Sequence, residues 1–127
     1  MNVPDALLYS KDHEWARAET GDRIRIGITD YAQDALGDVV FVQVPTVGTQ
    51  VKLGDSFSEV ESTKSVSDIY APIAGTVVEA NDALSDSPQL VNEDPYGEGW
   101  LCVIQASDAA QIDELMDAAA YRTLIEG

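Results

Sequence analysis

The chain has 127 residues, of which 45% are apolar, and a formal charge of −16. This length and apolar content suit one folded domain with a modest core and argue against disorder. So large a negative charge argues against binding to nucleic acid or to an anionic membrane surface, which both require clustered Lys and Arg. It favours partners with basic docking surfaces.

The N-terminus MNVPDALLYS has no basic region followed by an apolar run, and no stretch of the chain is apolar for long enough to span a bilayer. We therefore expect no signal peptide and a cytoplasmic protein. The single cysteine, Cys102, excludes an intrachain disulfide. Its setting, WLCVIQ, predicts a small buried hydrophobe in a strand.

The first predicted element follows a segment that holds Tyr9, His13 and Trp15 among polar residues and ends near Ala18. In RIRIGIT, at residues 23–29, isoleucines alternate with Arg23, Arg25 and Gly27, and a period of two predicts a half-buried strand.

A short helix is predicted next, over YAQDAL at residues 31–36. Asp30, with Gln33 three residues later, forms a weak capping box at its start, and Gly37 ends it. VVFVQV, which follows, is rich in branched residues and predicts a strand that ends at Pro45.

The rest of the chain divides into a β-rich part and a helical tail. Residues 47–84 are rich in turn signals with short strand-like runs between them, and WLCVIQA predicts a later strand. Residues 108–126 lack internal Gly and Pro and predict one or two helices. We expect a single domain, residues 1–127, with a β core over about 20–106 and a helical tail over about 108–126 packed on its outside.

A weak internal repeat gives the core a predicted symmetry. Gly48-Thr49, Val51 and Asp55 recur as Gly75-Thr76, Val78 and Asp82. Two copies of one unit predict a sandwich of two similar halves related by a pseudo-two-fold axis. The midpoint of the repeat falls at residue 65, so a hairpin that joins the halves would have its tip beside Lys64.

Lys64 is the one basic residue between Leu53 and Tyr121, a stretch with many acidic residues. It lies in ESTKSVSD among small hydroxyl residues, with hydrophobic runs on both sides. Most surface lysines are merely solvated, and that interpretation stays open at this point. The alternative is an acyl acceptor, because an amine on a flexible four-carbon stem suits the attachment of a cofactor arm.

An independent catalytic centre has little support in the sequence. His13 is the only histidine, so neither a multi-histidine metal site nor a Cys-His pair is indicated, and we interpret His13 as a structural residue beside Trp15. There is no GxxxxGK phosphate loop, and the acids of NEDPYGEGW lack calcium-loop spacing. We expect no catalytic residues and no metal ligands.

A set of motifs in a fixed order resembles the glycine cleavage H-protein family, which has the biotinyl/lipoyl carrier fold. The motifs are HEW (13–15), GITDYAQDALGDVVFV (27–42), PTVG (45–48), ESTKSVSDIYAPIAG (61–75), EANDAL (79–84) and PYGEGW (95–100). The resemblance extends from about Tyr9 to Glu126, nearly the whole chain. The resemblance implies a mainly β fold, a barrel-sandwich hybrid of two antiparallel sheets with a short internal helix and a C-terminal helical tail.

The resemblance also implies the modification site. By it, Lys64 carries covalently attached lipoate, and Glu61 and Gly75 occupy the positions that the lipoyl-attaching enzyme recognises. Many relatives have Val before the lysine, Ala after it, and His at the position of Tyr31. These departures leave a carrier function intact but remove support for a histidine in the cleft beside the predicted helix.

The implied function is that of a shuttle and not of an enzyme. A pyridoxal-phosphate glycine decarboxylase would load an aminomethyl group onto the arm, a folate-dependent aminomethyltransferase would remove it, and dihydrolipoamide dehydrogenase would reoxidise the dithiol. A lipoyl ligase or transferase is the fourth partner. We expect the loaded arm to fold against the protein, which would protect it from water, and Glu14 and Asp68 are candidates for contacting its amine.

Three related functions remain alternatives. One is a carrier that relays lipoate to other enzymes. Another is the lipoyl domain of a different complex, which usually has Asp-Lys-Ala and lacks HEW and the helical tail. The third is a biotin carrier, which usually has methionines beside its lysine.

Overall fold

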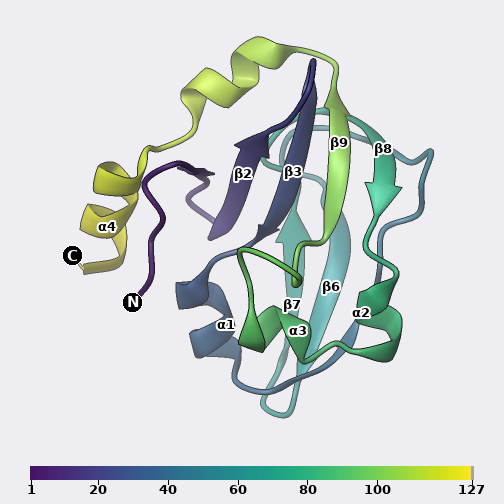
Figure 1. The fold of residues 1–127 in the computed structure, drawn as a ribbon, viewed down its shortest axis with the longest axis vertical. Coiled ribbons are helices and arrows are strands. Elements are labelled where there is room, and N and C mark those ends of the chain that lie inside the picture. The colour runs from purple at the N-terminus through teal and green to yellow at the C-terminus, as the bar shows by residue number, and fades with distance from the viewer. Residues whose placement is uncertain (127) are drawn as a thin grey trace.

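Two antiparallel sheets form the body of the protein in a computed structural model that describes residues 1–126 (Figure 1). The larger sheet has six strands in the order β1-β2-β3-β9-β8-β5. Their bounds are β1 (Leu8–Tyr9), β2 (Glu14–Ala18), β3 (Arg23–Ile28), β5 (Gln50–Val51), β8 (Gly75–Ala80) and β9 (Cys102–Ala106). The smaller sheet has the order β4-β6-β7, with β4 (Val39–Val42), β6 (Ser56–Ser62) and β7 (Val66–Tyr70).

Short helices connect and flank the sheets. They are α1 (Asp30–Leu36), α2 (Ala83–Asp86), α3 (Leu90–Glu93), the 3₁₀ helix η1 (Ala109–Glu114) and α4 (Ala118–Glu126). The predicted class, mainly β with two antiparallel sheets, an internal helix and a helical tail, is confirmed. None of the helices within residues 1–126 combines the length and the apolar character needed to cross a bilayer.

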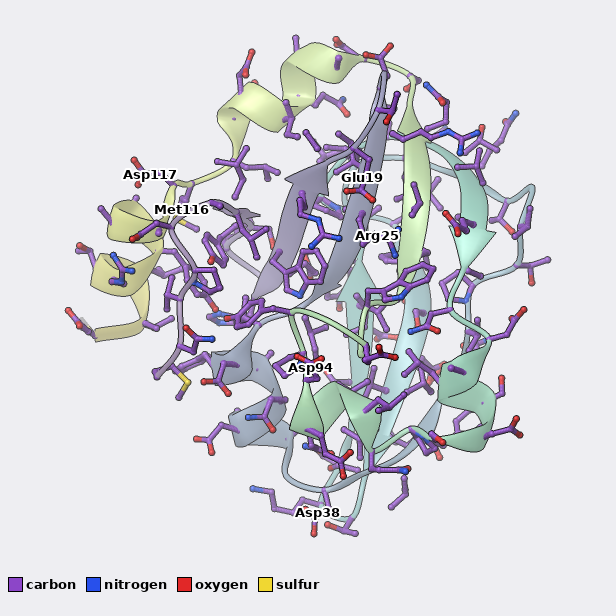
Figure 2. The ribbon with its side chains drawn as sticks, viewed as in Figure 1. Glu19, Arg25, Asp38, Asp94, Met116 and Asp117 are labelled. Atoms are coloured by element: carbon purple, nitrogen blue, oxygen red, sulfur yellow. The ribbon has the colours of Figure 1, made fainter. Side chains whose placement is uncertain are left out.

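The alternation in β3 creates part of the core, as predicted. Ile24, Ile26 and Ile28 are buried, and the first two pack with Cys102 and Ile104 of the neighbouring strand β9. Arg25 lies on the opposite face, where it pairs with Glu19 at 3.0 Å and stacks over the Trp100 ring at 4.2 Å. Figure 2 shows the Glu19 and Arg25 side chains close together on this face. The period of two thus separates an apolar face from a charged one.

Helix α1 begins one residue earlier than predicted, because its N-cap is Thr29 and not Asp30. The Thr29 hydroxyl accepts a hydrogen bond from the Ala32 amide, while Asp30 accepts one from the Gln33 side chain within the first turn. Thr29 is fully buried, and its hydroxyl satisfies one of the helix-end amides that lack a partner within the helix. Gly37 ends the helix, as predicted, with a φ of +83°.

The six-stranded sheet also takes in the segment before residue 20. Strand β2 pairs with β3 along its whole length, and β1 pairs with β2. Trp15 of β2 is fully buried and lies against Gly27 of β3, where a Cβ would come within 2.6 Å of the indole ring. The opening segment therefore belongs to the body of the domain.

The tail packs on the outside of the body as two helices, within the one-or-two-helix prediction. Tyr9 and Met116 exchange two backbone hydrogen bonds of 2.8 Å, which hold the residues between η1 and α4 in an extended form. In α4, Tyr121 is fully buried and stacks on Tyr9 with ring centroids 4.6 Å apart. The N-terminus and the end of α4 lie on the same side of the molecule (Figure 1).

The two copies of the sequence repeat pair with each other. Strand β5 of the first copy is antiparallel to β8 of the second, with Gln50 opposite Thr76 and Val51 opposite Gly75. The same antiparallel register results when the two copies are interchanged, as a two-fold axis requires. The predicted similarity of the two complete halves stays a prediction.

Candidate functional site

Lys64 lies at the tip of the hairpin that joins β6 to β7, as predicted, and its side chain is exposed. Ser62 closes this turn. Its backbone N–H donates to the Ser65 carbonyl at 2.8 Å, and its hydroxyl accepts from the amides of Lys64 and Ser65 at 3.1 and 3.0 Å. The backbone that carries the lysine is therefore held locally, while its amine stands in solvent.

The turn that follows α1 supports the hairpin tip from one side. The Thr63 amide donates to the Asp38 carbonyl at 3.0 Å. The stem of Lys64 crosses Gly37, where a Cβ would stand 2.9 Å from the lysine Cε. Figure 2 shows Asp38 at the end of the molecule where the β6–β7 hairpin also ends. A side chain at residue 37 would displace the lysine stem, and a positive φ also favours glycine there.

Asn92 of α3 fixes that turn in place. Its side-chain oxygen accepts from the Val39 amide at 2.8 Å, and its side-chain nitrogen donates to the Gly37 carbonyl at 2.8 Å and to Gln33 at 3.0 Å. One amide side chain thus joins α3, α1 and the start of β4. Within the described residues 1–126, ion pairs join Arg17 and Arg25 to Glu19, and Arg122 to Asp5. None of these ion pairs involves the amine of Lys64.

A cavity of about 300 Å³ opens beside the hairpin, between α1 and β7. Its lining includes Asp68 and Val66 from β7, Tyr31 from α1, and Asp12 and His13 from the loop before β2. The Tyr31 and His13 rings lie 4.7 Å apart, so Tyr31 contributes an aromatic wall to this cleft. The cavity is large enough for an extended aliphatic chain and carries carboxylates at its edge.

His13 has a structural role, although its neighbours differ from the predicted Trp15. Its Nδ1 hydrogen-bonds the Tyr121 hydroxyl at 2.8 Å, and that hydroxyl also bonds the Thr29 hydroxyl at 2.7 Å. Burial lowers the pKa of His13, which favours a neutral ring. The residue has a φ of +71°, so its hydrogen bond and its ring contact with Tyr31 hold a strained backbone at the cleft.

Glu14 is 2% exposed and lies in a second cavity, of about 510 Å³. The Ser10 hydroxyl donates to its carboxylate at 2.6 Å. Burial raises the pKa of the Glu14 carboxyl from 4.5 to about 7, and the hydrogen bond from Ser10 limits that rise. Glu14 and Asp68 therefore border different cavities, which share Asp12 in their linings.

Comparison with known proteins identifies the family. The model of the family "Glycine cleavage H-protein" matches residues 7–127. Glycine cleavage system H proteins of Anaeromyxobacter sp. (strain K) and Mycobacterium avium (strain 104) are 55% and 58% identical to this chain, and each alignment covers at least 98% of both proteins. The crystal structure of the H protein from Mycobacterium marinum superposes with a TM-score of 0.89 at 45% identity, covering 98% of this chain and all of that one.

The chain belongs to the glycine cleavage H-protein family. Members of this family are lipoyl-bearing carrier proteins that shuttle groups between the enzymes of the glycine cleavage system. The resemblance found in the sequence motifs is thereby confirmed, and so are the fold and the shuttle role that it implied.

The two residues predicted for recognition by the lipoyl-attaching enzyme lie in different settings. Glu61 lies at the end of β6 near the hairpin tip, half-buried, between Phe41 and Val66 on the flanking strands. Gly75 is buried in β8, where a Cβ would collide with the Gln105 carbonyl oxygen of β9. Close approach of two strands therefore explains a glycine at residue 75 without any contact to a partner.

Cys102 is fully buried in β9, as predicted, and burial raises the pKa of its thiol to about 12. A thiol with this pKa stays protonated near neutral pH and is a poor nucleophile. The residues that the structure describes include no group of three or more His, Cys, Asp or Glu able to hold a metal ion.

The residues that support the lysine carry no functional signal of their own in the sequence. The local pattern marks Gly37 only as a helix end, and it marks neither Asp38 nor Asn92. The family motif that runs from Gly27 to Val42 contains the first two and could have drawn attention to them. Asn92 lies outside the family motifs, and its contact with α1 exists only in the folded protein.

Proposed function

We propose that Lys64 carries the lipoyl group through which this H protein serves the glycine cleavage system. The supporting observation is an exposed amine at the apex of a hairpin whose backbone is fixed by Ser62 and by the Asp38 carbonyl. A fixed base with a free tip suits a swinging arm, because the arm then leaves from a defined point and its flexible part reaches the partners.

Attachment requires an amide between the lysine and the lipoate carboxyl group. The Nζ lone pair forms a bond to the carbonyl carbon of an adenylate made from lipoate and ATP, AMP leaves with its bonding electrons, and the amine loses a proton. Lys64 fits this chemistry because its neighbours Thr63 and Ser65 are small and exposed. Glu61 and Gly75 are the proposed recognition residues, and the buried Gly75 would act through the shape of the sheet.

The attached group would supply a cyclic disulfide, which accepts an aminomethyl group on one sulfur and is reduced by two electrons, and the dithiol left after transfer of that group would be reoxidised to the disulfide. The proposed partners are glycine decarboxylase, the folate-dependent aminomethyltransferase and dihydrolipoamide dehydrogenase, each visited in turn. The chain itself would act as a carrier and not as an enzyme, since its one thiol is buried and protonated. Its surface, with a charge of −16, would steer it toward basic docking surfaces.

We also propose that the arm lies in the cavity beside β7 when it carries an amine. Asp68 borders that cavity, and Asp12 connects its lining to the cavity that holds Glu14. A primary ammonium group near either carboxylate would form charge-assisted hydrogen bonds and would favour the ionised form of Glu14. If Glu14→Ala and Asp68→Ala leave the lifetime of the bound amine unchanged, this part of the proposal is wrong.

Intact mass tests the attachment site directly. Co-expression with a lipoyl ligase should add the mass of one lipoyl group to the wild-type chain, while Lys64→Arg should add none. Lys52→Arg is the matched control, because Lys52 is also an exposed lysine next to a turn, and this variant should be modified like the wild type. An unmodified wild type, or a modified Lys64→Arg chain, would contradict the proposal.

A further inference from the structure

Four exposed apolar side chains cluster on the three-stranded sheet. Val40, Phe41 and Val66 are 53%, 50% and 57% exposed, and Tyr70 is also exposed. All four lie on β4 or β7, the two strands that flank β6. Clustered exposed apolar side chains of this kind mark sites of contact with other molecules.

The strand register and the alternation along β7 place Phe41, Val66 and Tyr70 on one face. Phe41 is opposite Glu61, and Glu61 is opposite Val66, so the three form a row across the sheet. Directly opposed residues share a face, whereas their neighbours Val42 and Val60 point into the core and are buried. The row therefore faces outward, and it crosses the sheet beside the hairpin tip that carries Lys64.

A β-bulge adds to this face. The register between β4 and β6 shifts between Val39 and Phe41, so Val40 is an extra residue that has no partner of its own in β6. Two successive apolar side chains, at residues 40 and 41, consequently point toward solvent. A bulge re-aims a side chain in this way, and here it enlarges the apolar surface next to the row.

Carboxylates lie among and beside the apolar side chains. Glu61 lies within the row, and one step farther along the strands Glu59 is opposite Asp68. None of the three takes part in an ion pair formed within residues 1–126. The surface that would complement this face is apolar with Arg or Lys side chains set among its apolar groups.

We propose that this face, defined by Val40, Phe41, Val66 and Tyr70 with Glu59, Glu61 and Asp68, is the docking surface of the lipoyl-attaching enzyme. This inference rests on the proposed function, in that it takes Lys64 to be the modified residue. The attaching enzyme must bring its reacting carbon to Nζ itself, so it has to cover the surface next to the lysine. The later partners meet the end of a long arm and are free to dock farther away.

Kinetics of lipoylation by a purified lipoyl ligase test the surface. Val66→Ser should raise KM about fivefold with kcat little changed, because an apolar contact made on docking is lost. Phe41→Ser should act in the same direction, and Val66→Ile should retain the wild-type KM. Val47→Ser is the matched control, since Val47 is 58% exposed but lies outside this sheet, and it should leave KM unchanged.

Direct binding gives a second readout that needs no catalysis. The dissociation constant of the unmodified chain for the ligase, measured with neither ATP nor lipoate, should rise by the same factor for Val66→Ser and not for Val47→Ser. Glu59→Gln should flatten the dependence of this binding on salt concentration, whereas Glu79→Gln on the other sheet should not. Circular dichroism and thermal unfolding establish that each variant is folded.

The outcomes separate the two proposals. If the wild type is not modified at Lys64, the proposed function fails. If the wild type is modified but Val66→Ser and Phe41→Ser keep both KM and the dissociation constant, the docking inference is overturned. The inference is also overturned if Val66→Ser weakens only the action of glycine decarboxylase on the lipoylated chain, because the face would then serve another partner. It is overturned too if Val66→Ser weakens only a self-association measured by sedimentation, because the face would then bind a second copy of the chain.

Discussion

Replacing Glu14 by glutamine should change how the free energy of unfolding depends on pH. Glu14 is buried, and its pKa in the folded protein is raised to about 7 from 4.5. A carboxyl group with a raised folded pKa is fully stabilising when protonated, at low pH. That contribution is lost as the pH rises through about 7, because the folded protein then has to hold a desolvated charge.

The size of the effect follows from the two pKa values. Between about pH 5 and pH 8.5, ionisation of Glu14 should lower the wild-type free energy of unfolding by about 2.5 kcal/mol relative to Glu14→Gln. Glutamine has nearly the same shape and can still accept the hydrogen bond from Ser10, so the variant keeps the packing and loses the titration. A domain of this size is stable by roughly 5–15 kcal/mol, so the change is well within reach of measurement.

Urea denaturation at several pH values within this range provides the assay. All of these pH values lie above the sequence pI of about 4.1. Near the pI the chain would have little net charge. Glu79→Gln removes the same charge from an exposed position and corrects for the general effect of one carboxylate in an acidic protein. If the difference between Glu14→Gln and the wild type is the same at every pH, the desolvation argument for Glu14 is refuted.

Three further predictions concern other buried contacts. Gly75→Ala should lower the free energy of unfolding by about 1–3 kcal/mol, because the Cβ of the new alanine would meet the Gln105 carbonyl. An unchanged urea midpoint would contradict this expectation. Normal lipoylation of the folded fraction would identify Gly75 as structural. Asn92→Ala should lower the free energy of unfolding by about 1–3 kcal/mol. Hydrogen exchange should become faster at the Val39 amide, which donates to Asn92, and at the Thr63 amide, which donates to the turn that Asn92 holds. Unaltered exchange would show that the turn does not depend on Asn92. Cys102 should resist a thiol reagent in the native protein near neutral pH and react fully in denaturant, and rapid native labelling would refute its burial.

Local sequence patterns predicted the elements whose signal is contained in the element itself. The alternating isoleucines of β3 and the glycine that ends α1 are examples, because strand burial and a positive φ impose their requirements residue by residue. The N-cap of α1 is Thr29, one residue before the predicted Asp30. Thr29 and Asp30 can both cap a helix, and only the burial of Thr29 against Tyr121 decides between them.

Long-range contacts explain what the patterns did not predict. The segment with Tyr9 and Trp15 forms strands because β3 offers a paired edge, and the tail divides into two helices because Met116 pairs with Tyr9. Neither pairing leaves a local trace in the chain. Tertiary interactions of this kind override the weak preference of a short segment for one conformation.

The sequence by itself determined the family, the fold class and the position of Lys64 at a hairpin tip, since ordered motifs and a repeat carry that information along the chain. Only the tertiary structure showed that Gly37, Asp38 and Asn92 support the lysine and that Glu14 and Asp68 border separate cavities. The physical reason is that support and burial depend on which segments meet in space. The pKa of Glu14 is raised by the atoms that exclude water from it, and those atoms come from several distant parts of the chain.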